Sequence, residues 1–164
     1  MRSLIVYYSL EGNTEYAVNR IKEKTGFDEL RLVPKKAYKD KGFSKFVWGG
    51  KSALMGEKPK LENYEVDLAS YDRIIFGFPV WAATFTPPIR TFICDNMELL
   101  KGKKFAAFAC QSGNGAEKAF EKLANYIGID AFETTAIFFD PKMRPDGQKD
   151  AEIDDFAEKL LGDK

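Results

Sequence analysis

The sequence contains no histidine, and this absence excludes several kinds of catalytic site. Histidine-based catalytic triads and the common zinc sites need an imidazole, so neither fits this chain. The only cysteines, Cys94 and Cys110, are too few for a disulfide framework or a metal-ligand set. We therefore expect no metal site, and a protein that works in the reducing environment of the cytoplasm.

Neither sign of charge dominates, since 25 Lys and Arg residues balance 25 Asp and Glu residues. Nucleic-acid-binding surfaces are usually strongly basic, so we expect no nucleic-acid partner. The chain also lacks the acidic excess with which many electron carriers attract basic partners. No apolar run is long enough to cross a membrane, and the run near Met1 is too short for a signal peptide. A soluble protein without membrane contact is expected.

What the chain does contain is enough apolar material for a substantial core. Its 164 residues are 45% hydrophobic and include 14 phenylalanines. This length suits one ordinary α/β domain and is too short for two. We therefore expect a single domain that spans residues 1–164.

Apolar runs of strand length alternate along the chain with segments of helical periodicity. Strands are expected at residues 4–8, 27–33, 73–78, 104–110 and 131–139, and helices at about 14–25, 87–97, 116–127 and 153–161. This alternation predicts an α/β fold with a five-stranded parallel sheet and helices on both faces. In such sheets, ligands bind beyond the carboxyl ends of the strands, so the loops after the first, third and fourth strands are candidate sites.

Residues 34–60 are the least readable part of the chain. Phe43, Phe46, Val47, Gly50 and Leu54 could line one face of a helix, although Gly49-Gly50 weakens that interpretation. A second group of residues in this segment has two open interpretations. It could form a surface for a partner or substrate, or it could belong to a solvated basic helix that covers the sheet edge. This group consists of Lys45, Trp48, Lys51 and Met55.

The loop over residues 9–14 leaves the first strand and enters the first helix. Free backbone N–H groups and the helix dipole at such a position attract a phosphate. Short polar side chains and a glycine accompany them, in the order Ser9-Leu10-Glu11-Gly12-Asn13-Thr14. No Lys or Arg is present, so neutral donors would hold the anion, and we expect the Glu11 side chain to point outward. Alternatively, the loop is an ordinary capped turn between strand and helix.

The segment Ile5-Val6-Tyr7-Tyr8-Ser9-Leu10-Glu11-Gly12-Asn13-Thr14 resembles the start of flavodoxins, whose first loop binds the phosphate of flavin mononucleotide (FMN). The resemblance extends over about residues 2–160 and is weakest at 34–60. It implies the flavodoxin-like strand order 2-1-3-4-5 and FMN as the cofactor. It also implies phosphate contacts from Ser9, the Glu11 backbone, Gly12, Asn13 and Thr14.

Two further loops resemble the parts of flavodoxins that hold the isoalloxazine ring. A flat ring needs an apolar wall and hydrogen bonds at its edge, and Trp81 and Phe85 are the candidates for the wall. Both could instead pack beneath the loop. Cys110, at a strand end, is interpreted as a buried small residue and not as a nucleophile. The resemblance implies ring contacts from Pro79, Val80, Trp81, Ala82, Thr84 and Phe85 in one loop, and from Gln111, Ser112, Gly113 and Gly115 in the other.

One departure from the family concerns the loop between Pro79 and Pro88, which contains no glycine. In many flavodoxins a glycine there allows a peptide flip when the flavin gains one electron. The equivalent candidates here are Ala82, Ala83 and Thr84, and a positive φ costs such residues about 1–2 kcal/mol. The resemblance therefore predicts that one-electron-reduced flavin is poorly stabilised.

Three functions follow from these features. The first is an FMN electron carrier that serves redox partner proteins, and the second is a small FMN-dependent reductase that passes electrons from NAD(P)H to an acceptor such as a quinone. Neither needs a catalytic side chain. The third is a regulatory domain without flavin, which ranks lowest because Tyr8-Ser9 replace the acidic cluster that a receiver domain carries. The sequence leaves the oligomeric state open.

Overall fold

The computed structural model describes residues 1–38 and 44–162, with side chains described except at 44–48. It contains one parallel sheet in the order β2-β1-β3-β4-β5, which confirms the predicted architecture and strand order. The strands are β1 (Ser3–Tyr7), β2 (Asp28–Arg31), β3 (Arg73–Pro79), β4 (Lys104–Gln111) and β5 (Thr135–Phe139). The helices are α1 (Asn13–Thr25), α2 (Ser44–Leu54), α3 (Pro87–Leu100), α4 (Ala116–Ile127) and α5 (Gly147–Gly162), and a short 3₁₀ helix covers Leu68–Ser70.

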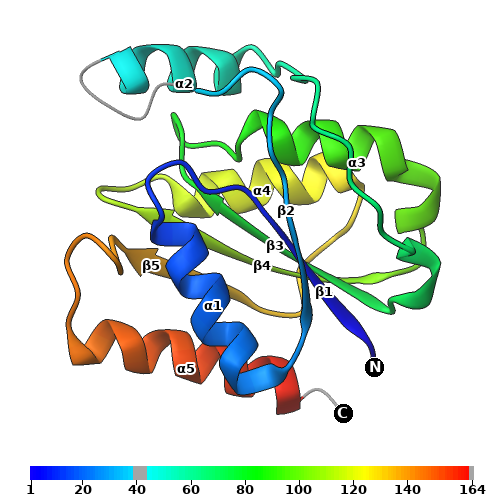
Figure 1. Cartoon of the computed structure of the whole chain (residues 1–164), viewed down its shortest axis with the longest axis vertical. Helices are drawn as coiled ribbons and strands as arrows, with labels where there is room; N and C mark the ends of the chain where they lie inside the picture. The colour runs from blue at the N-terminus through cyan, green and yellow to red at the C-terminus, as the bar shows by residue number, and fades with distance from the viewer. Residues whose placement is uncertain (39–43, 163–164) are drawn as a thin grey trace.

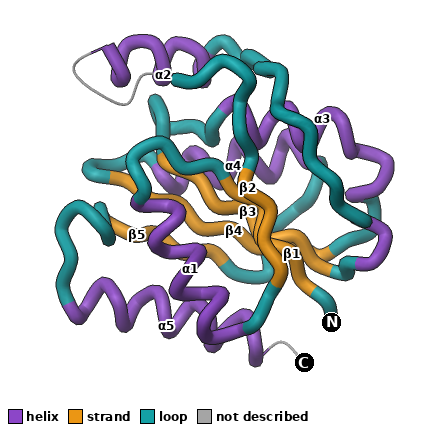
Figure 2. Tube along the Cα trace, viewed as in Figure 1, coloured by secondary structure: helices purple, strands orange, loops and turns teal. Residues whose placement is uncertain are grey.

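Helices cover both faces of the sheet. Figure 1 shows α1 and α5 on one face, α3 and α4 on the other, and α2 beside the loops that follow the strands. The tube in Figure 2 shows the strands stacked between these two helical layers. Neighbouring residues of β1 alternate between the layers, because Leu4 packs with α3 and α4 whereas Ile5 packs with α1 and α5. The central strands are therefore buried on both faces, as their continuous apolar sequences indicate.

Residues at the helix ends explain where several elements stop and start. Gly26 ends α1 in the left-handed conformation (φ 70°), and its N–H donates to the Lys22 carbonyl. Pro87 opens α3, where the missing N–H of proline costs no helical hydrogen bond. Both boundaries agree with the sequence-based expectation.

Two expected strand boundaries and one expected buried helix residue were wrong. Strand β2 is shorter than residues 27–33, because it is the edge strand and pairs with β1 only from Asp28 to Arg31. Strand β5 begins at Thr135 and not at Ala131, because its pairing with β4 begins with Thr135 opposite Ala107. In α2, Leu54 is 66% exposed and does not belong to a buried face. Phe43 and the side chains of Lys45, Phe46, Val47 and Trp48 lie outside the described part.

Helix α1 is attached to α5 by polar contacts. The Tyr16 hydroxyl donates to Asp150 Oδ1 at 2.7 Å. Arg20 donates from Nε and Nη2 to the two carboxylate oxygens of Asp154, at 2.7 and 2.8 Å. These Arg20 hydrogen bonds lower the pKa of the Asp154 carboxyl. The first helix is thus held in place by the last one.

Within the described ranges, no helix is long and apolar enough to cross a bilayer. The same residues contain no group of three or more His, Cys, Asp or Glu side chains placed to hold a metal ion. Both cysteines are free, Cys94 exposed and Cys110 buried.

Candidate functional site

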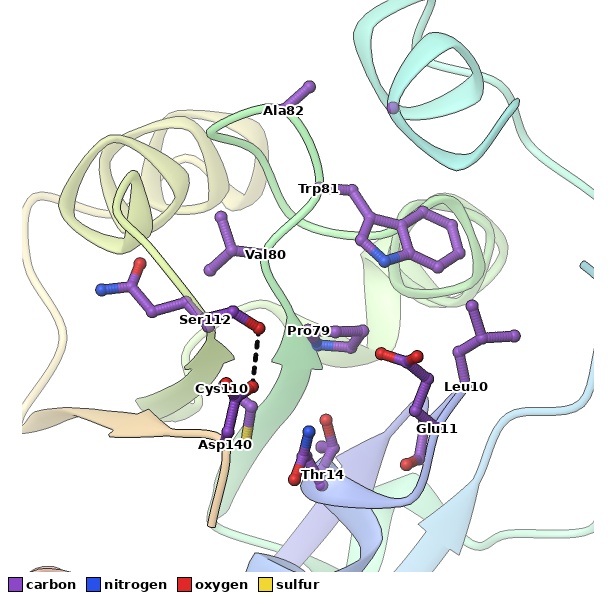
Figure 3. Close-up of a pocket in the computed structure, with 14 residues that line it drawn as sticks. Leu10, Glu11, Thr14, Pro79, Val80, Trp81, Ala82, Cys110, Ser112 and Asp140 are labelled. Carbon is purple, nitrogen blue, oxygen red and sulfur yellow. Dashed lines mark hydrogen bonds between the residues drawn. The ribbon is translucent and has the colours of Figure 1, made fainter. Parts of the chain in front are cut away.

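A pocket lies at the carboxyl edge of the sheet, where the loops after β1, β3, β4 and β5 meet (Figure 3). This is the place where parallel α/β sheets bind ligands. The pocket is lined by Ser9, Leu10, Glu11, Asn13, Thr14, Gly50, Pro79, Val80, Trp81, Ala82, Cys110, Gln111, Ser112 and Asp140. The three loops chosen from the sequence therefore meet at one site.

The loop after β1 has the geometry of an anion site. Gly12 is the N-cap of α1 and has a φ of 96°, a conformation that favours glycine. The Ser9 hydroxyl accepts a hydrogen bond from the Glu15 N–H at 3.2 Å and so fixes the loop against the first helical turn. The N-terminal N–H groups of α1 and the side chains of Asn13 and Thr14 adjoin the pocket.

The orientation of Glu11 differs from the expectation. Glu11 lines the pocket, and Figure 3 shows its carboxylate turned toward the cavity and not away from it. A negative charge on this side of the loop opposes a bound phosphate. The loop itself therefore offers polar donors together with an unfavourable charge.

The turn after β5 is attached to the loop after β1. Asn13 Oδ1 accepts hydrogen bonds from the backbone N–H groups of Lys142 and Met143, at 2.9 and 3.1 Å. Asp140 begins this turn with a φ of 43° and lines the pocket. Asn13 therefore serves the loop structure with its oxygen, while its side chain still adjoins the pocket.

The loop after β3 reverses direction in a tight two-residue turn. The Trp81 N–H donates to the Thr84 carbonyl at 3.1 Å, and the Thr84 N–H donates to the Trp81 carbonyl at 3.0 Å. Ala82 and Ala83 between them have φ values of 50° and 53°. Two positive φ angles inside such a pair of bonds characterise a type I′ turn, in which Asn-Gly is the preferred sequence. The missing glycine thus leaves two alanines in the left-handed region, each at a cost of about 1–2 kcal/mol.

We expect the double variant Ala82→Asn with Ala83→Gly to be more stable than the natural chain. Asn and Gly adopt positive φ more readily, so the free energy of unfolding should rise by about 1–2 kcal/mol. For a chain of this size the melting temperature should increase by roughly 2–4 °C per kcal/mol, measured by thermal unfolding. Ala131→Gly, at an exposed position outside the left-handed region, should lower stability instead. An unchanged or lower melting temperature for the double variant would contradict the backbone strain inferred at Ala82 and Ala83.

Trp81 forms the aromatic wall of the pocket. Its ring contacts Tyr8 and Tyr38 edge-on, with centroid distances of 5.7 and 5.0 Å. A Cβ built on Gly49 of α2 would lie only 3.2 Å from Trp81 Cε3. Gly49, which counted against a helix in the sequence, therefore lets the α2 backbone approach the indole ring closely.

The loop after β4 supplies polar groups to the opposite side. The Ser112 hydroxyl donates to Asp140 Oδ1 at 2.7 Å, as Figure 3 shows. Gln111 Oε1 accepts from the Ala116 N–H at 3.0 Å, at the start of α4. Burial raises the pKa of the Cys110 thiol to about 12, and the Asp140 carboxylate adds to this increase. Cys110 is therefore a neutral part of the wall at pH 7, as the sequence indicated.

Phe85 is not part of the wall. Its side chain is only 1% exposed and packs against Phe78, Tyr126 and Arg90, whose guanidinium carbon lies 4.5 Å from the ring centroid. The turn at residues 81–84 directs Trp81 toward the pocket and sends Phe85 into the core. Thr84 is buried for the same reason and contributes its backbone to the turn.

The expected glycines adjoin the pocket without lining it. Gly12, Gly113 and Gly115 shape the loops: a Cβ at Gly115, which has a φ of 105°, would lie 3.0 Å from Ala83 Cα. Gly115 thus allows the loops after β3 and β4 to approach each other.

Four lining residues were not predicted as ligand contacts, namely Leu10, Gly50, Cys110 and Asp140. Asp140 could have been found, because it follows β5 at the same edge of the sheet. Gly50 comes from α2, and no spacing in the sequence links that helix to the pocket.

The fold and the meeting of these loops define a doubly wound protein with one site for a phosphate and a planar ring at the carboxyl edge of its sheet. A model of the flavodoxin family matches residues 2–138 of the chain. The chain therefore belongs to the flavodoxin family, and this membership supports the expected FMN cofactor, which is the cofactor of that family. Among functionally curated proteins, no significant match is found.

Several solved structures share the fold. A flavoprotein from Lactobacillus acidophilus NCFM, determined in complex with FMN, is 19% identical with a TM-score of 0.69, covering 85% of this chain and 93% of that one. A candidate flavoprotein from Bacteroides eggerthii DSM 20697 is 20% identical with a TM-score of 0.72, covering 99% of both chains. Oxidised flavodoxin 1 from Bacillus cereus is 15% identical with a TM-score of 0.57, covering 100% of this chain and 99% of that one. At these sequence identities, the similarity to the three solved structures establishes a shared fold only.

Proposed function

We propose that this chain binds FMN in the pocket at the carboxyl edge of the sheet and carries electrons with it. The observation that carries the proposal is the convergence of a phosphate-type loop and an aromatic wall in one pocket. Ser9, Asn13 and Thr14 line one part of the pocket, and Trp81 lines another. The electrons would pass to redox partner proteins or to a small acceptor such as a quinone.

The residues present fit both ends of an FMN molecule. The start of α1 offers N–H groups and hydroxyls for a phosphate, and the positive φ of Gly12 lets the backbone approach it. Pro79, Val80 and Trp81 offer an apolar surface for the ring. Gln111 and Ser112 add polar groups for its edge.

When bound, the flavin ring supplies the redox chemistry, in steps of one or two electrons. The chain binds the phosphate, orients the ring between its loops and shields it from water. No side chain has to give or take a proton in this scheme, which agrees with the absence of histidine and with a Cys110 thiol that stays protonated.

The first experiment is an absorbance spectrum of the purified protein after FMN has been added and the excess removed. Retained bands near ~375 and ~450 nm are expected for an oxidised flavin cofactor. Thermal unfolding with and without FMN provides a second readout, because a ligand of the native state raises the melting temperature. A colourless protein that FMN does not stabilise would refute the proposal.

A reductase that uses NAD(P)H is the second candidate, and the glycine-free turn at Ala82 and Ala83 favours it. Ala82 and Ala83 lack the conformational freedom of glycine. A change of their backbone when the flavin gains one electron should therefore be costly, so two-electron steps would prevail. Stepwise dithionite titration should then show little of the one-electron form. Rapid oxidation of NAD(P)H with a quinone would identify a reductase, whereas a carrier alone should show little turnover.

A further inference from the structure

The phosphate end of the pocket lacks a positive charge in its own loop. Residues 9–14 contain no Lys or Arg, and Glu11 brings a carboxylate to the pocket side. Asp140 adds a second carboxylate to the lining. A phosphate with two negative charges would thus meet helix N–H groups in a pocket whose lining includes two carboxylates and no Lys or Arg. A nearby cation would change this balance.

Lys142, in the turn after β5, lies against this loop. A Cβ built on Gly12 would lie 2.6 Å from Lys142 Nζ and 3.1 Å from its Cδ. The end of the lysine side chain therefore crosses the loop directly at the N-cap of α1. Gly12 leaves open the space that this side chain takes, in addition to providing the positive φ.

The position of Lys142 is set by the backbone and not by chance contact of a long side chain. Its N–H donates to Asn13 Oδ1 at 2.9 Å, so its Cα is attached to the first residue of α1. The preceding Pro141 is buried, and the Arg144 N–H donates to the Asp140 carbonyl at 2.8 Å. The turn is therefore held at both of its ends.

Lys142 also differs from its basic neighbour Arg144 in its ion-pair contacts. Arg144 forms an ion pair with Asp140, with 3.4 Å between Nε and Oδ2. No carboxylate of the described chain lies within ion-pair distance of the Lys142 ammonium. Lys142 is thus available for an anion at the loop.

We propose that Lys142 supplies the cation for the phosphate of the bound flavin nucleotide and makes the site selective for FMN over riboflavin. The proposal rests on the proposed function and assigns a binding residue from outside the three loops that the family pattern marks. Binding energy at the ring end comes from Trp81 and is common to both flavins. The phosphate end distinguishes them through Lys142 and the N-terminus of α1.

The test compares Lys142→Gln with the natural chain by titrating the cofactor-free protein with FMN and with riboflavin, using the flavin fluorescence. Lys142→Gln should weaken FMN binding by up to about tenfold, because a charge-assisted hydrogen bond is lost at an exposed lysine. Riboflavin affinity should stay within about twofold. The loss should shrink with rising salt concentration, because salt screens the natural lysine.

Two further variants make the result specific. Lys142→Arg keeps the charge and should retain most of the FMN affinity. Lys122→Gln removes an exposed lysine of α4 that does not line the pocket and should leave both affinities unchanged. Thermal unfolding of each variant checks that the fold is intact.

Equal weakening of FMN and riboflavin by Lys142→Gln would overturn the proposal, because the lysine would then act only through the shape of the turn. Unchanged FMN affinity would overturn it as well. Failure of the natural chain to bind FMN would instead refute the proposed function, together with the role of Lys142.

Discussion

Replacing Trp81 with alanine is expected to weaken the binding of FMN and of riboflavin equally, by about 10- to 100-fold. Stacking of an aromatic side chain on a planar heterocycle contributes about 1–3 kcal/mol, and Trp81 is the aromatic residue that the pocket lining contains. Fluorescence titration of the cofactor-free protein with both flavins measures the effect. The equal loss contrasts with Lys142→Gln, which should affect FMN alone.

The control is Trp81→Phe, which keeps a ring on the wall and should lose only a few-fold in affinity. Because Trp81 also contacts Tyr8 and Tyr38, the melting temperature of each variant must be compared without flavin. Full flavin affinity in a well-folded Trp81→Ala variant would show that the indole ring does not hold the cofactor.

Gly77→Ala is expected to have the largest effect on stability. Gly77 lies in the central strand β3 opposite Phe108 of β4, and a Cβ there would lie 2.3 Å from Phe108 Cζ. Phe108 cannot retreat, because it packs against Phe138 and Phe156 with centroid distances of 5.7 and 6.0 Å. Overpacking typically costs 1–3 kcal/mol, and so direct a clash should cost about 3 kcal/mol or more in the free energy of unfolding. Urea denaturation measures this loss.

Gly113→Ala provides the matched control, since a Cβ there meets no atom within 4 Å. Its stability should change by less than about 0.5 kcal/mol. The pair Gly77→Ala with Phe108→Leu should recover part of the loss, because leucine occupies less of the contested space, and a double-mutant cycle quantifies the coupling. A Gly77→Ala variant as stable as the Gly113→Ala control would contradict the packing described.

The sequence was most informative where local chemistry decides the structure. The apolar runs at β1, β3 and β4 predicted buried parallel strands, and Gly26 predicted the end of α1. The loop after β1 was recognised because a strand followed by small polar residues and a helix almost dictates its own geometry. These features depend on residues that are close together in the chain.

The failures concern the course of one loop and contacts between distant segments. Trp81 and Phe85 are aromatic residues of the same loop, and only the turn between them decides which faces the pocket. The lysine beside Gly12 comes from a turn after β5, and the glycine against Trp81 comes from α2. No local pattern contains such pairings, since they arise when the sheet and its covering helices assemble.

The hydrogen bond that the Lys142 N–H donates to Asn13 Oδ1 has a further consequence for how the protein is made. Its two partners are separated by 129 residues, and a ribosome adds about 5–20 residues per second, so roughly 6–26 s pass between their synthesis. During that interval α1 lacks α5, whose apolar residues pack in the same buried cluster as Ala17, Val18 and Ile21. The Asn13 side chain can bond Lys142 and Met143 only after the last strand and the turn that follows it have been added. We therefore expect the cofactor to bind only after the turn that follows the last strand has been made.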